Sequence, residues 1–308
     1  MTDPAASRVK VLVPDDLGVE TLGSAPTVDA IRYVPGEPFP PEHRDATVVV
    51  VDYDNAEETG ARFAELPGLR LLQTLNAGFE QWLPQLPAGV QLSNGRGAHG
   101  GSSAEWVVAA LLSIYRELPH FARAQAAGRW DHRETETLIG KRIVVLGAGD
   151  LAVNLAARLT PFDTEVTLYA RTARPGVSAL ADVDAALPEA DAVVALLPLT
   201  DATRRVVDAA FLARLSDGAI VVNAGRGGLV DTDALLAELT SGRLRAALDV
   251  TDPEPLPPGH PLWSAPGLLL TPHVAGDTAG AWRRAYAVAL HQIEVFAAGG
   301  TPPNLVAG

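Results

Sequence analysis

The fold of this chain is decided by the stretch Arg142-Ile143-Val144-Val145-Leu146-Gly147-Ala148-Gly149-Asp150-Leu151-Ala152. An apolar run of strand length leads into a glycine turn, and a helical pattern follows. The spacing is G-x-G-x-x-A, in which glycines let the backbone approach a pyrophosphate and the helix start supplies free N–H groups. We therefore predict a dinucleotide at Gly147, Gly149, Asp150 and Leu151. The charge of Asp150 suits a helix start but would repel a pyrophosphate, and the sequence leaves its direction open.

Short apolar runs alternate with helical patterns on both sides of this turn, which predicts parallel βαβ units. The expected strands are 9–13, 48–51, 69–72, 90–92, 143–146, 166–169, 193–196, 220–223, 246–250 and 268–270, with helices at 231–241 and 278–298. We predict an α/β fold of two doubly wound domains. A Rossmann-type dinucleotide-binding domain, 98–278, would be inserted in a smaller flavodoxin-like domain that holds the substrate, 1–97 and 279–308.

The amino-acid composition limits the classes of ligand and partner that the chain can bind. Its 308 residues carry a formal net charge of −13, which disfavours nucleic acid and anionic membranes. No cysteine is present, so disulfides and thiolate metal sites are excluded, and we expect no metal. No signal-like segment or membrane span is evident, so we expect a cytoplasmic protein. Lys10 and Lys141 are the only lysines, so anionic groups must be bound by arginine.

A helix expected after Gly101 is apolar on every side. From Ala104 to Tyr115 only Glu105 and Ser113 are polar, and Ser102 or Ser103 is expected to cap the helix. A helix that is apolar all round must be covered all round. Two interpretations stay open, an ordinary buried helix and a helix shared across a homodimer.

The end of the second strand of the dinucleotide domain favours NADP over NAD. An acidic residue normally binds the ribose hydroxyls there, but this chain has Ala170 instead. Arg171, Thr172 and Arg174 follow, and an arginine can bind a 2′-phosphate directly. The alternative is that both arginines are solvated loop residues.

Three segments that follow predicted strands carry residues suited to acid–base chemistry on an anion. They are 222–231 with Arg226, 248–255 with Glu254, and 271–276 with His273. Ligands of open α/β sheets bind at the carboxyl ends of the strands, so we expect these three side chains to converge. A planar guanidinium suits a carboxylate, and a histidine can supply a proton near neutrality.

Four segments occur together in the order and spacing of a known family, namely 197–203, 223–231, 247–255 and 271–276. With them the chain resembles the D-isomer-specific 2-hydroxyacid dehydrogenases. The resemblance implies that Arg226 binds the substrate carboxylate and polarises the keto oxygen. It implies that His273 donates a proton to that oxygen as hydride arrives, and that Glu254 pairs with His273 and holds its ring.

The resemblance also assigns binding residues. In the first domain, the loop 74–79 would hold the substrate carboxylate by backbone N–H groups at Asn76, Ala77 and Gly78. Tyr53 follows a buried strand and is a further candidate for substrate contact. The remaining coenzyme positions implied by the family are Leu197, Pro198, Thr203, Asn223, Ala224, Asp249 and His273, with Asp249 approaching the nicotinamide amide.

The segments 76–79 and 96–101 look most like those of glyoxylate/hydroxypyruvate reductases. Thr251 stands where the family usually has an aromatic residue, and Ala152 replaces the third glycine, which puts the preferred substrate size in doubt. We expect an enzyme that moves a hydride between NADP, or NAD, and a small 2-keto or 2-hydroxy acid, as a homodimer joined through the coenzyme domain. The alternatives are a formate- or phosphite-type dehydrogenase and a non-catalytic NAD(P)-sensing protein like the family-related corepressors.

Overall fold

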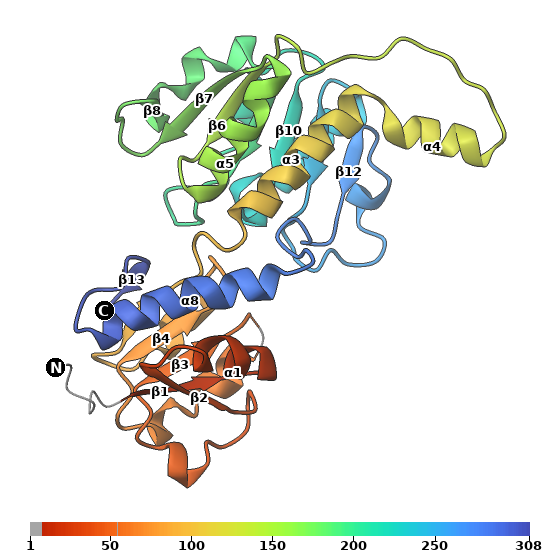
Figure 1. The fold of residues 1–308 in the computed structure, drawn as a ribbon. Coiled ribbons are helices and arrows are strands. Elements are labelled where there is room, and N and C mark those ends of the chain that lie inside the picture. The colour runs from red at the N-terminus through yellow and green to blue at the C-terminus, as the bar shows by residue number, and fades with distance from the viewer. Residues whose placement is uncertain (1–7, 54) are drawn as a thin grey trace. The chain divides into compact units, whose positions relative to one another are not determined.

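The computed structural model describes residues 8–53 and 55–308, and they form two compact units (Figure 1). The first unit contains the described residues up to His99 together with Ala279–Gly308. The second unit is Gly100–Thr278. The sequence-based division between residues 97 and 98 lies two positions before the division in the structure.

The first unit is built on a sheet with the order β13-β5-β4-β3-β1-β2. The pairs are parallel except for β13, which runs antiparallel to β5. Its strands are β1 Val9–Val13, β2 Val28–Arg32, β3 Val48–Val51, β4 Leu71–Thr74, β5 Gln91–Ser93 and β13 Leu305–Ala307. Its helices are α1 Asp16–Gly23, α2 Ala56–Gly60 and α8 Ala281–Ala297. The parallel order 2-1-3-4-5 is that of flavodoxin-like folds.

Both faces of the first sheet are covered. All four residues of β3 are buried, as expected for a central parallel strand. On one face Tyr286 and Ile293 of α8 pack with Val11 of β1. On the other face Trp82 belongs to a second apolar cluster. The carboxyl ends of the strands are therefore held in fixed positions by two cores.

The second unit is an all-parallel sheet with the order β12-β11-β10-β9-β6-β7-β8. Its strands are β6 Arg142–Leu146, β7 Glu165–Ala170, β8 Val177–Ala179, β9 Ala192–Ala195, β10 Ile220–Asn223, β11 Arg245–Leu248 and β12 Leu268–Leu270. Its helices are α3 Gly100–Tyr115, α4 Leu118–Ala126, α5 Asp150–Leu159, α6 Ala209–Leu212 and α7 Thr232–Ser241. The strand order reverses between β6 and β9, and in open α/β sheets ligands bind at such a point.

Helix α3 begins at Gly100, so the prediction that Ser102 or Ser103 caps it is wrong. The start of α3 instead lies against the start of α5. A Cβ atom at Gly100 would overlap the carboxylate of Asp150, and one at Gly101 would lie 3.2 Å from a guanidinium nitrogen of Arg158. Two small residues thus let the helices approach closely, and this packing sets the first turn of α3.

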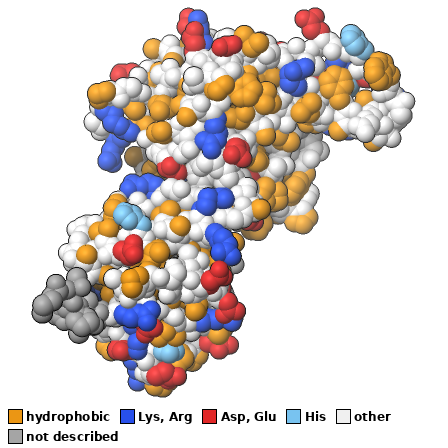
Figure 2. All heavy atoms as spheres, in the orientation of Figure 1, with side chains coloured by type: hydrophobic (Ala, Val, Ile, Leu, Met, Phe, Trp, Pro, Cys, Tyr) orange, Lys and Arg blue, Asp and Glu red, His pale blue; other side chains and the backbone are white. Residues whose placement is uncertain are grey.

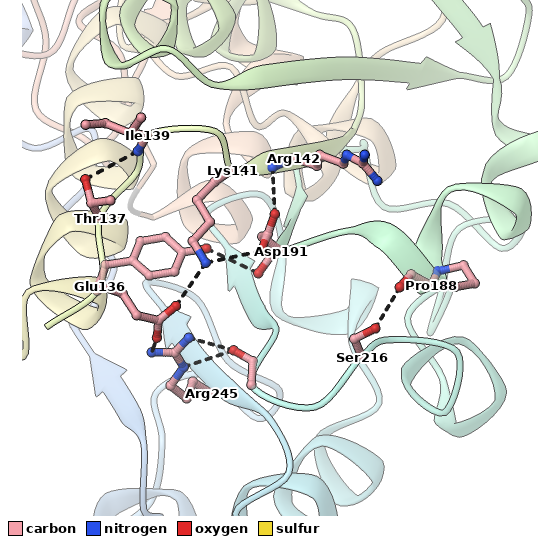
Figure 3. Close-up of polar contacts among 11 residues, drawn as sticks. Glu136, Thr137, Ile139, Lys141, Arg142, Pro188, Asp191, Ser216 and Arg245 are labelled. Atoms are coloured by element: carbon pink, nitrogen blue, oxygen red, sulfur yellow. Dashed lines mark hydrogen bonds and ion pairs between the residues drawn. The ribbon is translucent and has the colours of Figure 1, made fainter.

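A network of charged side chains joins the amino ends of three strands in the second unit (Figure 3). Glu136 pairs with Lys141 at 2.9 Å and with Arg245 at 2.8 Å, and Lys141 also reaches Asp191 at 3.2 Å. Burial alone would raise the pKa of Glu136, but its hydrogen bonds to Lys141 and Arg245 outweigh burial and lower it. The network fixes the segment that enters β6 at the edge of the sheet opposite the glycine turn.

The described helices include none that is both long and apolar enough to cross a bilayer.

Candidate active site

The glycine turn has the geometry that a dinucleotide requires. Gly147 follows β6 with φ +132°, and a Cβ atom there would lie 2.7 Å from the carbonyl oxygen of Leu196. Gly149 precedes the first turn of α5, and a Cβ atom there would meet nothing within 4 Å. Open space over a helix N-terminus is where a pyrophosphate binds. Ala152 is buried where the family has glycine, and Leu151 is half-buried beside it.

Asp150 points away from this open space. Its carboxylate lies against Gly100 of α3, and its Oδ1 accepts a hydrogen bond from Asn154 Nδ2 at 3.1 Å. The direction that the sequence left open is therefore toward α3 and α5. The residues of the turn fit a dinucleotide, because the one negative charge in the motif is turned to another helix.

The strand end that was predicted to select the coenzyme lies beside the glycine turn. Strand β7 ends at Ala170, and Arg171, Thr172 and Arg174 are exposed after it. Arg174 Nη2 donates to the carbonyl oxygen of Ala148 at 2.9 Å. One guanidinium thus reaches the glycine turn itself.

The turn after β9 is closed by a threonine side chain. Thr203 Oγ1 donates to the carbonyl oxygen of Pro198 at 2.6 Å and accepts from Thr200 N at 2.8 Å. Leu197 is 7% exposed, whereas Pro198 is exposed. The predicted coenzyme positions 197, 198 and 203 therefore belong to one tight turn next to the glycine turn.

Arg226 is positioned by the buried amide of Asn223, the last residue of β10. Asn223 Nδ2 donates to the carbonyl oxygen of Arg226 at 2.9 Å, and its Oδ1 accepts from Gly225 N at 3.1 Å. Arg226 is half-buried, and its Nη1 donates to the carbonyl oxygen of Gly225 at 2.8 Å. Ala224, between them, is also half-buried. Because the Asn223 amide bonds the loop both as donor and as acceptor, it fixes the backbone of Arg226 and so the position from which its side chain extends.

The loop of Arg226 packs directly on the loop that carries Glu254. A Cβ atom at Gly227 would overlap the carbonyl oxygen of Thr251, so only glycine allows this approach. Thr232 Oγ1 donates to the carbonyl oxygen of Asp252 at 2.9 Å and ties the same two segments together. Two of the three predicted segments are thus in contact.

Glu254 and His273 form a close pair. His273 Nδ1 lies 2.6 Å from Glu254 Oε1, and the side chains are 44% and 37% exposed. Nδ1 is directed at a carboxylate, so proton exchange with a substrate would use the other ring nitrogen, Nε2. The structure therefore brings an accessible imidazole, a carboxylate and the Arg226 loop to one edge of the second sheet.

His273 has a left-handed backbone, with φ +55°. Such a conformation costs about 1–3 kcal/mol for a residue other than glycine and persists where its surroundings enforce it. The His273 N–H donates to the carbonyl oxygen of Asp249 at 2.7 Å. The predicted contact of Asp249 with the nicotinamide amide stays a prediction, because here its carboxylate bonds the loop after β12.

The carboxylate-binding loop predicted in the first unit lies at the end of β4. The carbonyl oxygen of Asn76 accepts from Thr74 Oγ1 at 2.6 Å and from Gly95 N at 2.8 Å. Within residues 8–53 and 55–308, the backbone N–H groups of Ala77 and Gly78 donate to no protein acceptor. The carbonyl of Asn76 is thus fixed by two hydrogen bonds, with Ala77 exposed and Gly78 buried beside it.

Tyr53 follows β3 and is 56% exposed, and its carbonyl oxygen accepts from Gln81 Nε2 at 3.1 Å. Among the described residues, no group of three or more histidine or acidic side chains could hold a metal ion.

Sequence reasoning missed two residues that shape this site. Thr271 Oγ1 donates to Asp249 Oδ1 at 2.6 Å, and Gly227 makes the contact with Thr251 possible. Both lie in segments that the sequence singled out. Their roles depend on distances between segments, which spacing along the chain does not supply.

Comparison with known proteins agrees with this geometry. Residues 108–275, more than half of the chain, match the family "D-isomer specific 2-hydroxyacid dehydrogenase, NAD binding domain". A glyoxylate reductase from Thermofilum pendens is 30% identical over 255 residues, which are 78% of this chain and 75% of that protein.

Two solved structures resemble the whole chain. A D-isomer specific 2-hydroxyacid dehydrogenase from Xanthobacter autotrophicus Py2, in complex with NADPH and MES, has a TM-score of 0.84 at 30% identity and covers 97% of this chain and 98% of its own. An NADPH-dependent glyoxylate/hydroxypyruvate reductase from Sinorhizobium meliloti, in complex with NADP and sulfate, has a TM-score of 0.81 at 28% identity, with 97% and 98% covered. The chain belongs to the D-isomer-specific 2-hydroxyacid dehydrogenase family, whose members are NAD(P)-dependent enzymes acting on a CH–OH group.

Proposed function

We propose that this enzyme reduces a small 2-keto acid of the glyoxylate or hydroxypyruvate type, with NADPH as the preferred coenzyme. The proposal rests on the accessible His273–Glu254 pair beside the loop of Arg226. The names of the Thermofilum pendens and Sinorhizobium meliloti relatives support this substrate class.

Arg226 would bind the substrate carboxylate and polarise the neighbouring keto oxygen. A guanidinium presents two parallel N–H groups, which match the two oxygens of a carboxylate. In a chain of net charge −13, the half-buried Arg226 in the loop after β10 supplies the positive charge that an anionic substrate needs.

His273 would donate a proton from Nε2 to the keto oxygen. A bound nicotinamide coenzyme supplies the hydride, so negative charge develops on that oxygen. The imidazolium releases its Nε2 proton to the oxygen, while its Nδ1–H continues to donate a hydrogen bond to the carboxylate of Glu254 at 2.6 Å. Glu254 holds the ring so that the same nitrogen faces the substrate in both directions of the reaction.

In the first unit, the loop of Asn76, Ala77 and Gly78 is the candidate for binding a carboxylate through backbone N–H groups. This part of the proposal is supported by the carbonyl of Asn76, which two hydrogen bonds fix, and by the exposure of Ala77 after it. Tyr53 is the candidate for contact with the rest of the substrate because it is exposed after β3.

The function is tested by following NADPH oxidation with glyoxylate, hydroxypyruvate and pyruvate, and NADP reduction with formate and phosphite. We expect the highest kcat/KM with glyoxylate or hydroxypyruvate. Turnover of formate or phosphite alone would make the enzyme a dehydrogenase of that type. Tight NADPH binding without turnover of any compound would favour a sensor and contradict the proposal.

The preference for NADPH is supported by Arg171 and Arg174. Both follow β7 where NAD-dependent relatives of this fold carry an acidic residue, and Arg174 bonds to the glycine turn. A 2′-phosphate on the adenosine ribose would gain one or two charge-assisted hydrogen bonds there, each worth roughly 1.5–3 kcal/mol.

We expect the double variant Arg171→Ala, Arg174→Ala to raise KM for NADPH about 10–100-fold, because those bonds are lost. KM for NADH should change less than about threefold. The control is Arg214→Ala, which removes one positive charge beside Asp184, away from the glycine turn. Steady-state kinetics with both coenzymes measures the effect, and a wild-type preference for NADH would contradict the assignment.

We further propose that two copies of the chain pair through the second unit. Trp106, Val108 and Leu112 of α3 are only partly buried within one chain. Beyond α4, Trp130 is 96% exposed beside a hollow of about 620 Å³. Figure 1 shows α4 extending away from the sheet of its own unit, and Figure 2 shows hydrophobic side chains on the surface of that region. A partner copy would cover these side chains, which corresponds to the shared helix, one of the two interpretations that the sequence left open.

Light scattering coupled to size-exclusion chromatography is expected to give twice the chain mass of 32.2 kDa. Trp130→Glu should shift the protein toward one chain mass, because a charge would be buried in the interface. The control is Trp263→Glu, which changes another exposed tryptophan of the same unit. A wild-type protein of single mass at micromolar concentration would contradict the dimer.

A further inference from the structure

The carboxylate of Asp249 is buried, and among the described residues its hydrogen-bond donors all belong to the loop that carries His273. Its Oδ1 accepts from Thr271 Oγ1 at 2.6 Å and from Val274 N at 2.9 Å, and its Oδ2 accepts from Ala275 N at 2.9 Å. The residue is 3% exposed. A buried charge is unfavourable unless it is well bonded, and here three donors from residues 271–275 provide the bonds.

The main chain of Asp249 adds to this attachment. Its carbonyl oxygen accepts from His273 N at 2.7 Å, and its N–H donates to the carbonyl oxygen of Asn223 at 3.0 Å. Asn223 in turn bonds the loop of Arg226. The loop of His273 is thereby joined through one residue to the strand end that positions Arg226.

These hydrogen bonds flank the unfavourable backbone conformation of His273. His273 has φ +55°, while Thr271 before it and Val274 after it are both held by Oδ1 of one carboxylate. If the carboxylate were absent, the loop would be free to return His273 to an ordinary conformation. The imidazole would then leave Glu254.

On the basis of the proposed function, we propose that Asp249 is a positioning residue for proton transfer. Its carboxylate enforces the left-handed backbone of His273 and so directs the imidazole to Glu254 and its Nε2 to the substrate. Asp249 itself exchanges no proton in this role.

A carboxylate is required at position 249 because its two oxygens accept hydrogen bonds from three donors. In Asp249→Asn, the side-chain NH₂ group faces either the N–H of Ala275 or the donors at Oδ1, so at least one donor meets another donor. Thr271→Val keeps the shape of the side chain and removes only the donor at 2.6 Å. The two variants therefore perturb the same loop to different degrees.

The family resemblance implies that Asp249 binds the nicotinamide amide, and this role predicts a different effect of its replacement. If the carboxylate served mainly to bind the nicotinamide amide, its loss would weaken coenzyme binding. If it positions His273, its loss lowers the rate of the chemical step while the coenzyme and the keto acid still bind.

We expect Asp249→Asn to lower kcat about 100-fold and Thr271→Val about tenfold, because small displacements of a catalytic group have effects of this size. KM for the keto acid and the Kd for NADPH should stay within about threefold of wild type. A kcat near the wild-type value in both variants would overturn the proposal. A loss of activity accompanied by a matching rise in the Kd for NADPH would overturn it as well. Should Asp249→Asn fail to fold, Thr271→Val alone decides by the same criteria.

The control is Asp191→Asn, which changes a carboxylate that accepts a backbone N–H, from Arg142 at 2.8 Å, at the opposite edge of the same sheet. Its kcat should match wild type. A similar fall in kcat in this control would assign the effect to general destabilisation and overturn the proposal.

A second readout requires no substrate. In protein with ¹⁵N-labelled histidine, the Nδ1–H resonance of His273 is assigned by its change in Glu254→Gln. We expect this resonance to be lost or strongly shifted in Asp249→Asn, and an unchanged resonance would overturn the proposal. If no keto acid is turned over but the resonance changes, the proposed function fails and the positioning role stands.

Discussion

Replacing His273 by asparagine is expected to lower kcat for keto-acid reduction by roughly 10²–10⁴-fold, because an amide cannot donate a proton to the developing oxyanion. Asparagine tolerates a left-handed backbone better than most residues, so the loop at φ +55° should be retained. The Kd for NADPH should stay nearly unchanged. Steady-state kinetics and fluorescence titration with NADPH measure the two quantities.

The matched control for this variant is His120→Asn. His120 also pairs with a carboxylate, Asp131 at 2.8 Å, but on α4 rather than at a strand end. Its kcat should remain within about twofold of wild type. If His273→Asn retained more than about a tenth of wild-type kcat, His273 would be excluded as the proton donor.

Replacing Arg226 by alanine is expected to lower kcat/KM about 10³-fold, through a higher KM and a lower kcat together. One group would both anchor the carboxylate and polarise the keto oxygen, so its loss weakens substrate binding and removes transition-state stabilisation. The variant should keep its fold, because the Asn223 amide bonds the backbone of this loop rather than the guanidinium. Initial rates over a wide range of keto-acid concentration separate the two effects.

Two comparisons sharpen the result for Arg226. Arg226→Lys keeps the charge but not the planar pair of donors, so it should recover less than a tenth of the lost activity. Added guanidinium chloride should partly restore kcat in Arg226→Ala. Wild-type kinetics in Arg226→Ala, with Arg214→Ala as the charge control, would remove Arg226 from the mechanism.

Four strands were predictable with their bounds because most of their residues are apolar. β1, β3 and β10 have the predicted bounds, since parallel strands covered on both faces contain few polar residues. β12 also has them, because it is a run of three leucines, although it lies at a sheet edge. The missed strands are β2, β8 and β13, which lie at sheet edges. β2 contains Asp29 and Arg32, and the other two have three residues each, so neither hydrophobic pattern nor length identified them.

The strand-end placement of Arg226, Glu254 and His273 followed from the sequence because the topology of a parallel sheet brings these ends to one edge. The backbone of His273 did not follow from it. A left-handed histidine depends on bonds from a residue 24 positions earlier, and no local pattern signals them. The direction of Asp150 was likewise undetermined, because it depends on the close approach of α3 at Gly100.

A charged network lies at the amino ends of β6, β9 and β11 and consists of Glu136, Lys141, Asp191 and Arg245. The residues proposed for catalysis lie at the carboxyl ends of the strands. A strand of four or five residues separates the two edges by about 15 Å. Substitutions that far apart, with no shared partners, usually contribute additively. Thermal stability can therefore be engineered at the amino ends of the strands of the second sheet. Selectivity for larger or smaller acids can be changed separately at their carboxyl ends.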